Sequence, residues 1–238
     1  MSASGLLLLG EGERDVGRID PTTKRRPPCD FEGDLPRLVR RLSEVACGRT
    51  RFGYDADTIH AVNTRIAHRG RPTRLGGKSK ALRNAVIAAL QTHSTVIALI
   101  DARVEELQDL QRDVHDILTQ CRERSAEAKV AIGLAIQEVE IWMMADPHSR
   151  DAALGANVGQ EPVPDDLEAV GDPKALWRGK AGQVHVPDGA DAELHADQLR
   201  RAAWASLRPD VVAHSCPRGF APFMREVLDA LPWTDVTG

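Results

Sequence analysis

The sequence predicts an α/β protein with a mostly parallel β-sheet, helices on both faces of the sheet, and a helical and loop-rich C-terminal extension. Short apolar runs of strand length recur up to Ile136, and amphipathic stretches separate them. This alternation is typical of a parallel sheet with crossover helices. Beyond Asp146, frequent prolines and glycines divide the chain into short pieces. We therefore expect a sheet-containing core at 1–146 and an extension at 147–238, packed on it as one compact unit.

The first strand is the leucine run 6–9, which leads through a glycine-containing turn into a helix. A polar stretch at 20–28 is rich in Pro, Arg and Lys and predicts a loop. Apolar residues then recur on one helical face at 35–45, and Gly48 is suited to end that helix. The segment 58–67 alternates weakly between apolar and polar residues and predicts a short strand.

The remaining elements of the core alternate in the same way. They are expected, in order, as a helix at 80–91, a strand at 95–100, a long amphipathic helix at 104–124 and a strand at 131–136. The extension is expected to be dominated by loops. Its convincing helices lie at 192–207 and 220–231, where they could pack back on the sheet.

The composition is that of an ordinary folded protein. Of 238 residues, 42% are hydrophobic and 28% are charged, and the formal net charge is −4. Any nucleic acid would therefore have to be met by a local basic patch. The scattered cysteines lack the spacing of a zinc site and fit reduced thiols in a cytoplasm. No apolar stretch reaches the length of a membrane span, so no membrane partner is expected.

Two of the predicted strands end in a carboxylate. Glu11 follows the strand at 6–9, and Asp101 follows the strand at 95–100. The carboxyl ends of parallel strands meet at one edge of a sheet, and carboxylates gathered there suit a divalent cation such as Mg²⁺. The alternative for each residue alone is that it caps the helix that follows.

These residues resemble those of a TOPRIM domain, the fold of topoisomerases, primases and OLD-type nucleases. Its hallmarks are a glutamate after the first strand, often followed by glycine, and an Asp-x-Asp after a later strand. Glu11 and Gly12 supply the first element, whereas Arg103 stands at the second aspartate. The chain is most similar to the TOPRIM-related family of bacterial defence islands often labelled RloG-like, at 11–15, at the strand that ends in Asp101 and above all in the block 137–146. Weaker similarities lie at 172–174 and 216–223.

The resemblance implies a TOPRIM-like, Rossmann-like sheet and a site that uses Mg²⁺ or Mn²⁺. Glu11 would act as general acid or base, and Asp101 would hold the metal together with Glu11. Because Arg103 stands at the usual aspartate, the remaining ligand would come from Glu105, Glu138 or Glu140. Glu138 and Glu140 would share one side if the strand persists through them; the alternative is that they solvate an exposed face while Trp142 packs in the core.

Arg103 has three interpretations. It could bind a phosphate, form an ion pair with a neighbouring glutamate, or mark a domain that has lost its metal and its catalysis.

A basic, glycine-containing segment precedes the helix predicted at 80–91. Arg74, Lys78 and Lys80 flank Gly76 and Gly77, an arrangement that suits phosphate binding at a helix N-terminus. A solvated surface loop is the equally weighted alternative. The spacing of the glycines does not match a P-loop, so ATP binding is excluded here.

The expected function is a metal-dependent TOPRIM-like phosphodiesterase, a nuclease of a bacterial anti-phage or restriction-linked system acting on DNA rather than RNA. The resemblance also implies a neighbouring ATPase subunit, and a homo-oligomer is allowed. The alternative is a noncatalytic binding or regulatory subunit on the same scaffold. A receiver-like phosphoacceptor at Asp101 ranks third, since the downstream half of the chain does not match it.

Overall fold

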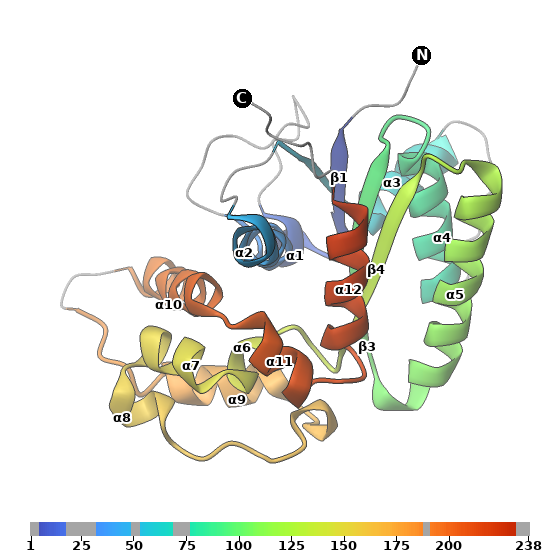
Figure 1. Cartoon of the computed structure of the whole chain (residues 1–238). Helices are drawn as coiled ribbons and strands as arrows, with labels where there is room; N and C mark the ends of the chain where they lie inside the picture. Colours follow the sequence, from blue (N-terminus) through green and yellow to red (C-terminus); the bar gives the residue numbers. More distant parts are fainter. Residues whose placement is uncertain (1–4, 18–31, 49–52, 69–76, 188–190, 232–238) are drawn as a thin grey trace.

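The computed structural model describes residues 5–17, 32–48, 53–68, 77–187 and 191–231 (Figure 1). Within these ranges the protein is α/β, as predicted, with a four-stranded sheet in which every strand is parallel to its neighbours. The strands are β1 (Leu6–Gly10), β2 (Asp55–Thr58), β3 (Thr95–Ala102) and β4 (Lys129–Ile136). Their order across the sheet is β2-β1-β3-β4, so β1 and β3 form its centre.

Helices cover both faces of the sheet because successive side chains of each strand point to opposite sides. Leu6 and Leu8 pack with α2 (Asp34–Cys47) and α12 (Phe220–Ala230), whereas Leu7 and Leu9 pack with α4 (Lys78–Ala89) and α5 (Leu107–Arg124). Figure 1 shows these helix pairs on opposite sides of the strands. Burial on both sides explains why β1 is an unbroken leucine run.

The strand predicted at 58–67 was wrong. Strand β2 ends at Thr58, and 59–68 forms helix α3 (Ile59–His68). The hydroxyl of Thr58 accepts a hydrogen bond from the backbone N–H of Ala61 at 3.1 Å, which favours a helix start at this point. Ile59 and Val62, three residues apart, are both buried in the layer with α4 and α5.

The extension contains more helix than its prolines predict. After α6 (Glu140–Ala145) come α7 (Pro147–Leu154), α8 (Ala156–Gly159), α9 (Pro173–Ala181), α10 (Ala192–Ser206) and α11 (Pro209–Ser215). Pro147 and Pro173 begin helices rather than breaking them, because a proline at the first helical position loses no hydrogen bond. The aspartate before each one caps the helix: Asp146 accepts the N–H of His148, and Asp172 that of Ala175. The helices expected at 192–207 and 220–231 are present as α10 and α12.

The helices after residue 146 share an apolar layer with the sheet. Ile97 and Leu99 of β3 belong to the same buried cluster as Trp204 of α10 and the two phenylalanines of α12. Trp142 of α6 is fully buried in this cluster, edge-on to Phe220 at 5.1 Å and stacked with Phe223 at 5.8 Å between ring centroids. The position of Trp142 in the core is therefore confirmed.

Strand β4 ends the sheet on one side and is covered by α12. Glu226 of α12 accepts a hydrogen bond from the backbone N–H of Ile132 at 3.1 Å. Gly133 allows this close approach, because a Cβ there would lie 2.7 Å from the ring of Phe223. Among the described residues, no helix is long and apolar enough to cross a membrane.

Candidate functional site

The strand order creates a switch point between the ends of β1 and β3. From β1 the chain passes to β2 on one side, and from β2 it crosses to β3 on the other side. Ligands of open parallel sheets bind at such a switch point, beyond the carboxyl ends of the strands. Glu11 directly follows β1, and Asp101 is the second-to-last residue of β3. The structure therefore brings the two predicted catalytic residues to one edge of the sheet.

A tight turn after β1 adds a third carboxylate. Asp15 belongs to the short helix α1 (Glu13–Val16), which follows the turn. One of its carboxylate oxygens accepts a hydrogen bond from the backbone N–H of Gly12 at 2.9 Å. Asp15 folds back closely against the end of β1. A Cβ added to Gly10 would lie 2.4 Å from the Cβ of Asp15. Glycine at position 10 is thus required for this approach.

Four acidic side chains at this edge influence one another, and we call Glu11, Asp15, Asp101 and Glu138 the carboxylate cluster. The pKa of Asp101 is raised to about 7, first by burial and then by the negative charges of Asp15, Glu11 and Glu138. Burial also raises the pKa of Asp15. Burial is the largest cause of both shifts, and the neighbouring carboxylates add to it, so a nearby cation would make ionisation of these carboxyl groups easier.

Two lysines from opposite sides approach the carboxylate cluster. Lys78, the first residue of α4, lies 2.8 Å from Glu11 and also donates to the backbone carbonyl of Asp101. Lys174, in the first turn of α9, lies 2.5 Å from Glu138, and its charge lowers the pKa of Asp101. Each lysine therefore holds one outer glutamate, while Asp101 and Asp15 lie between them on the strand and turn.

The strand ends at Ile136 and does not persist through Glu138 and Glu140, so the condition under which they would share one side is not met. Gln137 adopts a left-handed conformation with φ of 64°, and its N–H donates to Ala102 at 2.6 Å, which ends β4 and turns the chain into α6. Glu138 stays in the turn beside Asp101, whereas Glu140 enters α6 and is only 1% exposed. Glu140 lies 3.1 Å from Arg200 and 3.5 Å from Arg14.

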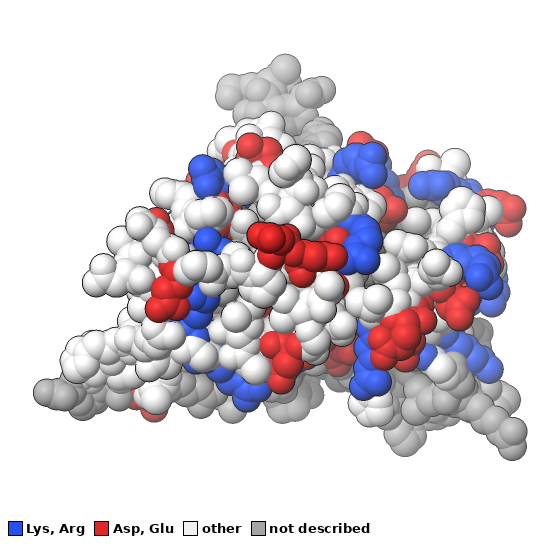
Figure 2. All heavy atoms as spheres, turned by 90° about the horizontal axis from the view of Figure 1, so that it is seen from below, with Lys and Arg blue, Asp and Glu red and all other residues white. Residues whose placement is uncertain are grey.

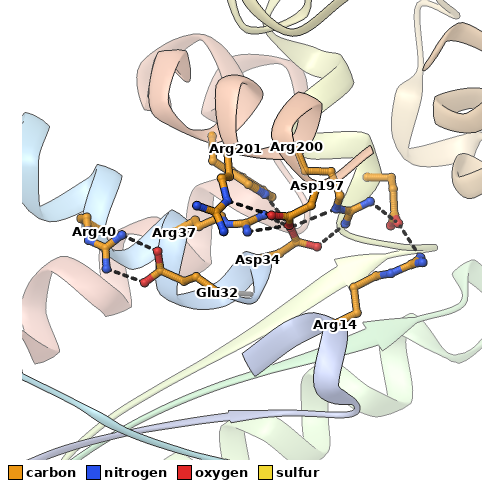
Figure 3. Close-up of polar contacts among 10 residues, drawn as sticks. Arg14, Glu32, Asp34, Arg37, Arg40, Asp197, Arg200 and Arg201 are labelled. Carbon is orange, nitrogen blue, oxygen red and sulfur yellow. Dashed lines mark hydrogen bonds and ion pairs between the residues drawn. The ribbon is translucent and has the colours of Figure 1, made fainter. Parts of the chain in front are cut away.

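Glu140 belongs to a buried ion-pair network that joins α2 to α10. In Figure 3 the guanidinium of Arg200 points toward Asp34 at the start of α2. Asp34 accepts hydrogen bonds from Arg200 and from the indole of Trp204, the latter at 2.7 Å. Beside it, Arg37 lies 2.7 Å from Asp197 of α10. These partners satisfy charges that would otherwise be costly to bury.

The other predicted site residues lie apart from the cluster or outside the described ranges. Arg103 and Glu105 are exposed at the one-turn 3₁₀ helix Val104–Glu106, and neither is among the groups that perturb Asp101. Lys80 is exposed on α4. Arg74 lies outside the described residues.

Charges of both signs are interspersed over the face seen from below in Figure 2. A nucleic acid approaching the described part of this face meets no broad field of one sign, so its contacts would be local.

Sequence reasoning missed Asp15 and Lys174 as site residues. Asp15 lies four residues after Glu11, a spacing that a tight turn and one helical turn bring together. Lys174 comes from the extension, just after the aspartate and proline that start α9. Only the segment 172–174, one of the weaker echoes of the resemblance, pointed to it.

The donors at this edge suit a hard divalent cation, since they are carboxylate oxygens from three neighbouring strand ends. One oxygen of Glu138 is also buried without a hydrogen-bond partner. In the described ranges, however, no three His, Cys, Asp or Glu side chains are already arranged to hold a metal ion. Glu11 and Glu138 are instead turned to Lys78 and Lys174.

Comparison of the chain with protein-family models, curated proteins and solved structures gives no match. The geometry of this edge therefore carries the functional argument.

Proposed function

We propose that the carboxylate cluster is the site of metal-dependent phosphodiester hydrolysis, and that the protein is a TOPRIM-like nuclease acting on DNA rather than RNA. The observation that carries the proposal is the meeting of four carboxylates at the switch point between β1 and β3, with the pKa of Asp101 raised to about 7. Carboxylates gathered at such a place favour the binding of a cation. From the resemblance in the block 137–146 we propose that this nuclease serves a bacterial defence system.

Glu11, Asp101 and Glu138 are the residues that would hold Mg²⁺ or Mn²⁺, after Glu11 and Glu138 leave their lysines. Bound there, the metal would neutralise charge on the phosphate and lower the pKa of a water molecule. Asp15 holds the turn that presents Glu11, through its bond to the N–H of Gly12. Glu11, 36% exposed, is accessible to move a proton at the attacking or leaving oxygen.

Lys78 and Lys174 have a second role in this proposal. If a cation took their place at the glutamates, their ammonium groups would remain at this edge of the sheet, where they would contact non-bridging phosphate oxygens. In the structure the two lysines engage Glu11 and Glu138, the glutamates that would have to turn to the metal.

A plasmid-nicking assay with and without Mn²⁺ tests the proposal. Wild-type protein should convert supercoiled plasmid to the nicked form only with Mn²⁺ or Mg²⁺. Glu11→Gln should reduce the rate at least about 100-fold, because it removes both a metal ligand and the proton-transfer group. Glu127→Gln is the matched control, because Glu127 is exposed just before β4, at the opposite edge of the sheet. The nicking rate of this variant should equal that of wild type. Equal activity of wild type and Glu11→Gln would refute the assignment.

The second candidate function is a noncatalytic binding or regulatory subunit, working with an ATPase. Its supporting observation is that Lys78 and Lys174 form ion pairs with Glu11 and Glu138. Calorimetric titration with Mn²⁺ separates the candidates: binding that Asp101→Asn abolishes favours the nuclease, and absence of binding favours the regulatory subunit.

A further inference from the structure

A cleft of about 380 Å³ opens beside the carboxylate cluster, between α9, α10 and the start of α6. Its walls include the apolar side chains of Trp177 and Leu199, both almost fully buried. Glu140 and Arg200 also line it and come from the buried network of Figure 3. The cleft therefore combines an apolar interior with fixed charges.

Positive side chains dominate the ionisable lining of the cleft. Arg14, Lys174, Arg178 and Arg200 line it, against the single carboxylate of Glu140. Arg200 is fully engaged with Asp34 and Glu140. Arg178 is different: it is exposed, and its Nε donates to the backbone carbonyl of Lys174 at 3.2 Å. Its terminal nitrogens make no hydrogen bond or ion pair with the part of the chain that the structure describes, and they suit an anionic group.

Two lining residues carry polar atoms that are closed to solvent and lack a hydrogen-bond partner within the described ranges. They are one carboxylate oxygen of Glu140, a residue only 1% exposed, and Nε2 of His195. A buried polar atom without a partner is unfavourable, because it has lost its hydrogen bonds to water. A ligand that donates to Glu140 and bonds to His195 would remove this cost. The lining of the cleft therefore suits a molecule with an apolar, planar body, polar edge groups and an anionic end.

We propose that this cleft binds one nucleotide unit, with its base between the apolar walls and its phosphate at Arg178 and Arg14. An exocyclic amino group of a base is the donor that Glu140 requires, and a ring nitrogen or sugar hydroxyl matches His195. This inference rests on the proposed function for its biological meaning, since the nucleotide would be the one next to the cleaved phosphodiester. Its binding chemistry is independent of any metal.

Lys174 connects the cleft to the carboxylate cluster. The side chain of Lys174 lines the cleft and pairs with Glu138, and its charge lowers the pKa of Asp101. A nucleic-acid strand with one base in the cleft would therefore carry its next phosphate toward Lys174 and the carboxylate cluster. The cleft selects for nucleic acid by holding a base, a task that the carboxylates cannot perform.

Binding of deoxyadenosine monophosphate to the full chain in EDTA tests the proposal, measured by calorimetry. Deoxyadenosine and inorganic phosphate are the companion probes, and a short single-stranded oligonucleotide distinguishes a strand from a free nucleotide as the ligand. We expect the monophosphate to bind more tightly than either companion. Arg178→Ala should weaken the monophosphate about tenfold without affecting deoxyadenosine, and His195→Ala should weaken both. Arg112→Ala, at an exposed arginine of α5, should change nothing.

Absence of monophosphate binding, or binding that neither Arg178→Ala nor His195→Ala weakens, would overturn the inference. The nicking assay keeps the two proposals apart. Nicking without nucleotide binding refutes the cleft alone, whereas nucleotide binding in a protein that never nicks refutes the nuclease alone.

Discussion

Asp101 is the residue on which the electrostatics of the site converge. By alternation along β3 it faces the same side as Ile97 and Leu99, toward α2 and the extension rather than toward α4 and α5. That direction places it among Asp15, Glu138 and Lys174. The position on the strand, and not only the residue type, therefore makes this carboxylate difficult to ionise.

The raised pKa of Asp101 predicts a pH-dependent stability in metal-free buffer. The folded chain keeps this proton up to about pH 7, whereas the unfolded chain releases it near the ordinary value of 3.8. The folded state thus binds more protons in this window, and stability falls as pH rises through it. Asp101→Asn should be more stable than wild type by about 1–3 kcal/mol at pH 8 and nearly equal at pH 4. Urea unfolding at both pH values checks this, and an effect of the same size at both would contradict it.

At the residue scale, sequence reasoning reached Glu11 and Asp101 because a carboxylate at the end of a buried strand is a local pattern. It misplaced Glu140 because one left-handed residue, Gln137, ends the strand. The apolar residues of β4 give no indication that the chain turns at Gln137. Lys174 was missed because its approach to Glu138 joins segments 36 residues apart, through packing of α9 against α6.

Among the elements, the turn between β1 and α1 is sterically demanding. Gly10 and Gly12 flank Glu11, but they do different work. A Cβ at Gly10 would strike Asp15, whereas a Cβ at Gly12 would have no heavy atom within 4 Å. The glycine that follows the glutamate is the one a motif search notices, yet the glycine before it sets the geometry.

Replacing Gly10 by alanine should lower the stability of the protein, whereas replacing Gly12 should leave it unchanged. Gly10→Ala should destabilise the protein by about 1–3 kcal/mol, because the turn must open to admit the methyl group. It should also weaken Mn²⁺ binding, since Glu11 and Asp15 move with the turn. Gly12→Ala should stay within about 0.5 kcal/mol of wild type. Thermal unfolding with and without Mn²⁺ measures both effects; equal losses in the two variants would show that the turn is not constrained as described.

Element types were predicted well where apolar periodicity is strong, as in β1, β3, β4, α2, α5, α10 and α12. The failures have local causes. Strand β2 is polar and short, and it is held by pairing with β1 rather than by its own pattern. The prolines of the extension were interpreted as breaks, although an aspartate before each of two prolines marks a helix start.

For the molecule as a whole, the buried network between α2 and α10 joins the extension to the sheet. Asp34 bonds to both Arg200 and Trp204, more than 160 positions away in sequence. Such pairs depend on the complete fold and leave no trace in a local pattern. The strand order also depends on distant parts of the chain. The general rule for parallel sheets predicts that a switch point exists, but the local sequence pattern does not show that β1 and β3 form it.

Breaking this network should destabilise the entire chain. Asp34→Ala leaves Arg200 and the Trp204 indole short of a buried partner and should cost about 3–5 kcal/mol. Asp109→Ala, which removes an exposed pair with Arg112, should cost at most about 1 kcal/mol. Urea unfolding followed by tryptophan fluorescence and by circular dichroism should shift together in Asp34→Ala. Separation of the two curves would show that the extension unfolds independently.

The carboxylate that Glu226 directs at the outer side of β4 also has a consequence for behaviour at high concentration. An end strand with free N–H groups is a template on which another chain can add a strand, and this is a common route to aggregation. Here α12 lies along that strand, and Glu226 occupies the N–H of Ile132. At the other end of the sheet, β2 offers only a short strand of four mostly polar residues. Both ends of the sheet are therefore poor starting points for intermolecular β-pairing.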